Sequence, residues 1–179
     1  MDPRLCHISQ IKGISMQRIL FLVIIVILTP SGYSAQEPAS WAGEELLFET
    51  FSIAGVDPMT GESGVAVTTR RPCVGNGVPW VRAGVGAVAT QASTRVAYGE
   101  QLLTMIAEGE DPAEALKSAL SGDSLAHRRQ VALISIDGKS AQHTGSATNP
   151  WTGHRSGNNY VAPGNGLVGA EVLAAVSAS

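Results

Sequence analysis

The chain has 179 residues, of which 12 are basic and 15 are acidic, so its formal net charge at pH 7 is −3. A chain with this balance lacks the basic surface that nucleic-acid binding requires, so nucleic acid is not expected as a partner. The length suits one domain with a modest hydrophobic core.

The chain opens with a segment that is typical of export. An unbroken run of ten apolar residues, I-L-F-L-V-I-I-V-I-L, covers residues 19–28, follows Arg18, and leads through small residues to Ala35. This run is too short for a membrane span of about 20 residues but matches the core of a signal peptide. We therefore expect residues 1–35 to be cleaved after Ala35 or Ser34, with residues 1–15 as an extension upstream of a start at Met16. The mature protein would be secreted or periplasmic; an uncleaved N-terminal anchor is the alternative.

Removal of this leader changes the composition of the remaining chain. The leader carries three basic residues and one acidic residue, so the other 144 residues have nine basic and 14 acidic groups and a formal charge of −5. Cys6 leaves with the leader, and a single remaining Cys73 cannot form an internal disulfide, so stability must come from packing. We interpret Cys73 as a structural or surface residue, with a nucleophilic role as the alternative. Residues 36–49 are expected to form a linker.

The chain is organised around residues 50–92, which begin with a predicted β-hairpin. Phe51, Ile53, Val65 and Val67 alternate with small residues on either side of D-P-M-T-G-E at residues 57–62. Proline at the second position of a turn and glycine where φ must be positive are hairpin signals. Residues 81–90 are almost all Gly, Ala and Val, so we expect one buried strand beside the hairpin.

Two helices and a second hairpin follow. Helical periodicity covers residues 98–108, and D-P-A-E at residues 111–114 predicts an N-cap, a first-turn proline and the start of a second helix. Residues 131–136 and 139–144 are predicted strands, and residues 146–159 a loop rich in polar chemistry. A short strand at 160–162, a turn at 163–166 and a helix from Val172 complete the pattern. Such blocks of strands and helices indicate an α+β domain with mainly antiparallel sheets.

Several motifs occur in a fixed order between residues 50 and 176. They are T-F-S-I, D-P-x-T-G-E, G-V-A-V and V-P-W-x-R-A-G-V-G-A-V-A-T-Q-A, followed by H-T-G, W-x-G-H and G-N-x-L-V-G-x-E-V-L. Together they resemble the uncharacterised family named domain of unknown function 1028. The resemblance implies an N-terminal-nucleophile hydrolase-like α-β-β-α sandwich over residues 50–179, without a known substrate. Members of this family usually continue further, so we expect the domain to be incomplete at its C-terminal end.

The resemblance also implies a reaction. An N-terminal-nucleophile hydrolase cleaves an amide with a Thr, Ser or Cys whose own α-amino group is the base, so the nucleophile must be the first residue of the mature chain. The matching residue here is Thr50. Cleavage of the leader leaves 14 residues ahead of it, so a second cut between Glu49 and Thr50 is required. The plainer interpretation is that Thr50 is a β-branched residue that opens a strand.

Other polar residues are assigned to the same pocket. Arg82 and Arg70, at strand ends, would stabilise an oxyanion or a substrate carboxylate. Gln91, His154 and Asn165 would contact the substrate. The structural alternative is a solvated cation for each arginine, and for Gln91 a core amide whose hydrogen bonds are satisfied within the protein.

The sequence predicts neither a metal site nor a cofactor. It has no H-x-x-x-H, C-x-x-C or carboxylate-rich spacing, and its glycine-rich segments lack a P-loop lysine and the dinucleotide-binding spacing. We expect a small-molecule or peptide-like substrate, or cell-wall material, as the partner. The competing hypothesis is a non-catalytic envelope or extracellular binding module on the same fold. A mature N-terminus at Thr50 favours the enzyme, and one at Gln36 favours the binding module.

Overall fold

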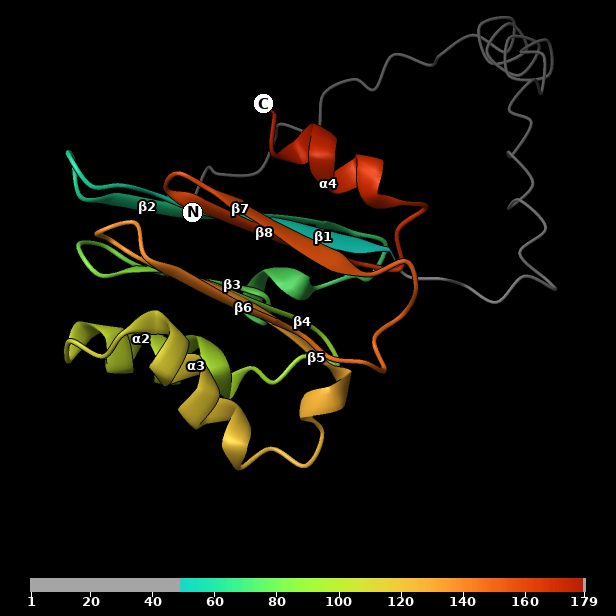
Figure 1. The fold of residues 1–179 in the computed structure, drawn as a ribbon, viewed down its shortest axis with the longest axis horizontal. Coiled ribbons are helices and arrows are strands. Elements are labelled where there is room, and N and C mark those ends of the chain that lie inside the picture. Colours follow the sequence, from blue (N-terminus) through green and yellow to red (C-terminus); the bar gives the residue numbers. More distant parts are fainter. Residues whose placement is uncertain (1–48, 179) are drawn as a thin grey trace, which may run out of the picture. The chain divides into compact units, whose positions relative to one another are not determined.

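The computed structural model describes residues 49–178, which contain two antiparallel four-stranded sheets and three α-helices (Figure 1). The predicted leader, and the linker up to residue 48, lie outside the described residues. The first sheet has the order β2-β1-β8-β7, formed by Glu62–Thr69, Thr50–Asp57, Tyr160–Asn165 and Gly153–Gly157. The second sheet has the order β3-β4-β5-β6, formed by Pro79–Arg82, Gly86–Ala92, Arg129–Ser135 and Ser140–Thr144. The predicted α+β class with antiparallel sheets is confirmed.

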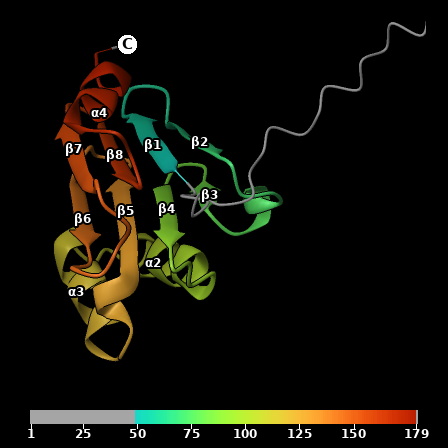
Figure 2. The ribbon, with the colours of Figure 1, turned by 90° about the vertical axis from the view of Figure 1, so that its right-hand side faces the viewer.

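The helices lie on the outer sides of two stacked sheets. Figures 1 and 2 show α2 (Ala97–Ala107) and α3 (Pro112–Ser121) against the second sheet, and α4 (Ala170–Val176) against the first. Two 3-10 turns complete the described chain, η1 (Val74–Asn76) and η2 (Ala126–Arg128). No helix in residues 49–178 is long and apolar enough to cross a membrane.

The predicted hairpin is present. β1 and β2 pair in register from Thr50 opposite Thr69 to Asp57 opposite Glu62. At the turn the Asp57 Oδ1 atom accepts a hydrogen bond of 2.8 Å from the Met59 amide, and Gly61 has the positive φ of 76° that its position requires.

The expected single strand over residues 81–90 is wrong. The segment forms β3 and β4, which are joined by a tight turn in which the Val85 amide donates to the Arg82 carbonyl over 3.0 Å. Gly84 and Gly86 adopt positive φ values of 70° and 153°, and a Cβ on Gly86 would lie 2.1 Å from the Ile134 carbonyl oxygen. These glycines reverse the chain, and β4 therefore lies in the second sheet instead of pairing with the hairpin.

The two predicted central helices are confirmed and cover the main apolar core. The Asp111 side chain accepts a hydrogen bond of 2.9 Å from the Ala113 amide, so this residue caps α3 as its sequence motif predicts. The core between these helices and the second sheet is built from large side chains such as Tyr98, Leu102 and Leu133. The core cluster between the sheets has smaller side chains, those of Ala54, Ala87, Ala132, Ile134 and Val161.

The last part of the chain differs from the expected loop and turn. β7 lies within the predicted loop 146–159, and β8 continues to Asn165, so the predicted turn at 163–166 is wrong. The sequence does not indicate β7 because its residues are exposed and polar and do not alternate with apolar ones. It indicates a turn within β8 because proline, here Pro163, normally marks a turn or an edge strand. α4 begins at Ala170, two residues before the expected start.

Candidate functional site

A cleft of about 400 Å³ opens at the end of the inter-sheet layer where β1 begins. Its walls come from both sheets and from the loops that join them. The lining residues are Thr50, Arg71, Val74, Val78, Gln91, Ala92, Ser93, Thr94, Arg128, Ala147, Thr148, Asn149 and Asn165. Three of the residues predicted from sequence, Thr50, Gln91 and Asn165, are therefore brought together.

Thr50 is the first residue of β1, and only 7% of it is exposed. Its Oγ1 atom lies 2.8 Å from the Oγ1 atom of Thr69, its partner on β2, and on its other side it pairs with Asn165 of β8. Glu49 precedes it, so the Thr50 nitrogen in this chain is an amide, which has no basic lone pair. The hydroxyl is placed at a cleft, and the nitrogen beside it is an amide and not an α-amine.

A chain of buried amide side chains joins the two sheets beside Thr50. Gln130 Nε2 donates to the carbonyls of Gly153 (3.0 Å) and Gly164 (2.9 Å), and this fixes the orientation of the Gln130 amide because carbonyls only accept. Gln130 Oε1 then accepts from Gln91 Nε2 (2.8 Å) and from Asn165 Nδ2 (2.9 Å). The network therefore ties β4, β5 and β8 together next to the cleft.

Gln91 and Asn165 differ in what they offer a ligand. Gln91 donates to Gln130 and to the Pro163 carbonyl (3.2 Å), and its Oε1 accepts from Ser52 Oγ (2.5 Å), so its hydrogen-bonding capacity is used within the protein. Gln91 thus fits the structural interpretation of a satisfied core amide. Asn165 uses one N–H on Gln130, and in the described part of the chain its Oδ1 atom and its second N–H make no other hydrogen bond.

The two arginines predicted for the pocket lie elsewhere. Arg82 forms an ion pair with Glu100 (2.5 Å) against α2, and it pairs with Gly86, at the opposite end of β4 from Gln91. Arg70 is exposed and lines a different hollow, beside α4. The cations that do line the cleft are Arg71 and Arg128.

Sequence reasoning missed both of these arginines for local reasons. Both residues lie in the bend that follows the end of β2 at Thr69, where Arg71 lines the cleft and its neighbour Arg70 lines the other hollow. Arg128 ends the short η2 turn, within the H-R-R sequence of residues 127–129. No motif marks either position.

His154 lies behind the amide network and is not among the residues that line the cleft. Thr144 Oγ1 accepts from Gln130 Nε2 (3.0 Å) and lies 3.0 Å from His154 Nδ1, so its hydroxyl hydrogen is free to donate to that nitrogen. Partial desolvation, followed by the nearby charge of His143, lowers the pKa of His154 below its usual value, although the residue lies on the exposed strand β7. The structure thus connects His154 to the site through Thr144 and Gln130.

Comparison with known proteins agrees with the sequence motifs. The model of a family of unknown function (DUF1028) matches residues 50–179. The chain belongs to the DUF1028 family. A crystal structure of the protein SPO2555 from Silicibacter pomeroyi, with the same family assignment, is 34% identical and matches 72% of this chain with a TM-score of 0.69. This DUF1028 chain spans 57% of the length of that protein. No protein with a curated function shows significant similarity.

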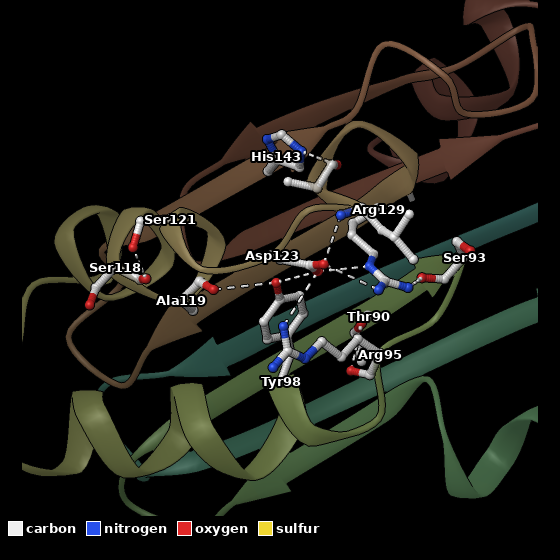
Figure 3. A network of polar contacts seen from close by, with 12 residues as sticks. Thr90, Ser93, Arg95, Tyr98, Ser118, Ala119, Ser121, Asp123, Arg129 and His143 are labelled. Carbon is white, nitrogen blue, oxygen red and sulfur yellow. Dashed lines mark hydrogen bonds and ion pairs between the residues drawn. The ribbon is translucent and has the colours of Figure 1, made fainter.

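The DUF1028 chain has a second polar network, which joins Tyr98, Asp123, Arg129 and Ser93 (Figure 3). The buried carboxylate of Asp123 accepts from Arg129 Nε (2.9 Å) and from the Tyr98 hydroxyl (2.7 Å). Arg129 also donates to the Ser93 carbonyl (2.5 Å), and Ser93 lines the cleft. This contact fixes the backbone next to Ala92, which has a φ of 64°, a conformation that residues with a side chain rarely adopt.

The Asp123 network predicts an acid-sensitive stability. The hydrogen bond from Arg129, followed by that from Tyr98, holds the pKa of Asp123 well below its usual range. Because the folded pKa is lower than the unfolded value of about 3.9, the stabilisation is present above that pH and is lost as the pH falls towards the folded pKa. We expect the native chain to melt at a higher temperature than Asp123→Asn. This difference in melting temperature should be largest above about pH 5 and should shrink below about pH 4. A difference that stays constant down to pH 3 or so would contradict this linkage.

Metal ligands are not clustered in the described chain. Within residues 49–178 no group of three or more His, Cys, Asp and Glu side chains is placed to hold a metal ion. The chemistry that the site offers from its own side chains is that of hydroxyls, amides and two guanidinium groups.

Proposed function

We propose that this chain is the precursor of an N-terminal-nucleophile amide hydrolase, with its two sheets and outer helices as the corresponding α-β-β-α sandwich. The observation that carries the proposal is the position of Thr50. It is the first residue of β1, it is almost buried, and it lines the cleft. Cleavage of the single peptide bond between Glu49 and Thr50 would therefore place a free α-amine beside a hydroxyl at a cleft.

The reaction follows from these groups. The neutral α-amine of Thr50 takes the proton from Oγ1 as that oxygen attacks the substrate carbonyl carbon. The tetrahedral intermediate collapses as the amine leaves with the transferred proton, and an ester remains on Oγ1. Water, deprotonated by the same α-amine, then hydrolyses the ester and releases the acid. Asn165, with one N–H unused in the described chain, is our candidate donor to the developing oxyanion.

One observation favours a second function. The Thr50 nitrogen is acylated in the chain as given, and the cleft is nonetheless formed and lined with polar groups. A protein that kept residues 36–49 would use this cleft to bind a ligand without cleaving it. We carry this binding module as the alternative proposal.

The N-terminus of the exported protein separates the two proposals. We further propose that residues 1–35 direct export and are removed, and that a second cut then exposes Thr50. Intact-mass analysis and N-terminal sequencing of protein from the periplasm or medium should find chains that begin at Gln36 and at Thr50. A product that still carries Met16 would refute leader cleavage. A product in which residues 36–49 always remain attached would favour the binding module.

A further inference from the structure

The cleft beside Thr50 is cationic although the chain is acidic. Arg71 and Arg128 both line it, and none of its lining residues is Asp or Glu, whereas the whole chain has a formal charge of −3. They reach the cleft from different segments, Arg71 from the connection between β2 and η1 and Arg128 from the end of η2. Two cations from separate segments around one hollow make its potential positive.

Several basic side chains in the described region are neutralised locally. Carboxylates pair with Arg82, Arg95, Lys117, Arg129 and Lys139. Arg128, in contrast, makes no side-chain hydrogen bond or ion pair within residues 49–178, while its carbonyl accepts from the Ser93 amide (3.1 Å). Its backbone is thus held to the cleft wall and its guanidinium group is left for a ligand.

We infer that the cleft recognises a carboxylate, so that the substrate is an amide of an amino acid or peptide with a free carboxyl group. A guanidinium group presents two parallel N–H donors that match the two oxygens of a carboxylate. The unused groups of Asn165, on the same cleft, suit the polar amide that such a substrate carries. Hydrolysis of this substrate rests on the proposed function, whereas its recognition needs only the two arginines.

The test compares a carboxylate probe with its neutral amide of the same size, N-acetylglycine and N-acetylglycinamide. Their binding to the full 179-residue chain is measured by ligand-observed NMR at low and at high salt. We expect the carboxylate to bind at least fivefold or so more tightly at low salt, with the preference shrinking as salt screens the exposed arginines. Arg128→Gln should reduce the preference about threefold, and Arg71→Gln together with Arg128→Gln should abolish it.

Arg70→Gln is the matched control, because it removes the same charge from the residue next to Arg71 but lies at another hollow. It should leave the preference unchanged. Thermal unfolding of each variant confirms that the fold is intact. Equal binding of the two probes, no binding of N-acetylglycine near its solubility limit, or an equal effect of Arg70→Gln would overturn the inference.

The same experiment keeps the two proposals apart. If the preference is present but no form of the protein hydrolyses N-acyl amino acids, the carboxylate site stands and the hydrolase proposal fails. If amides are cleaved with no preference for a free carboxylate, the hydrolase stands and the carboxylate site fails.

Discussion

A chain that begins at Thr50 is expected to lose amide hydrolysis by about 10⁴-fold or more when Thr50 is replaced by valine, because the variant keeps the shape of the side chain and removes the attacking oxygen. The fold should survive. The substitution removes one side-chain hydrogen bond, that with Thr69, which is worth about 1 kcal/mol. Thr50→Ser keeps the hydroxyl and should retain most of the activity.

Covalent labelling gives a second readout that needs no substrate. An electrophile that captures both a hydroxyl and an adjacent amine should modify the chain that begins at Thr50, as measured by intact mass. Residues 36–49 acylate the amine when they are attached, so the longer chain should not react in this way, and neither should Thr50→Val. If a folded chain that begins at Thr50 fails to label, the hydrolase proposal should be replaced by the binding module.

Local sequence signals predicted the elements whose geometry is set by neighbouring residues. The turn at residues 57–62 and the cap at Asp111 both depend on side chains within two or three positions, and both are present. The prediction for segment 81–90 is wrong because its Gly-Ala-Val composition indicates one continuous strand. Two glycines with positive φ divide it, and at Gly86 the backbone of β5 also leaves no room for a side chain.

The site was predicted only in part, because its chemistry depends on contacts across the sheets. Thr50 was found through a family motif, and Asn165 through another. Gln130 gave no signal, since a glutamine that opens a strand is usually solvated, and its partners lie 34 and 39 residues away along the chain. Arg71 and Arg70 cannot be told apart without the direction of the backbone between β2 and η1.

Gln130→Leu is expected to lower the free energy of unfolding by about 3–5 kcal/mol, a large part of the roughly 5–15 kcal/mol that stabilises a typical domain. The side chain is fully buried, and the substitution keeps its approximate volume. It leaves the Asn165 amide and the carbonyl of Gly153 without the partners they have in the native protein. Each buried polar group without a hydrogen-bond partner lowers the free energy of unfolding by about 1–3 kcal/mol, and Gln130→Leu leaves several such groups at once.

Gln142→Leu is the matched control, because the same change is made on the neighbouring strand β6 at an amide that the network does not use. The Oε1 atom of Gln142 is buried and has no hydrogen-bond partner in the described chain, and its Nε2 makes one long contact of 3.4 Å with Ser156. Its removal eliminates an unsatisfied group, so stability should be unchanged within about 0.5 kcal/mol or should rise. Urea unfolding of the two variants measures the contrast. Equal losses of unfolding free energy in the two variants would show that the hydrogen bonds of the amide network do not stabilise the fold. Apolar packing alone would then hold the two sheets together beside Thr50.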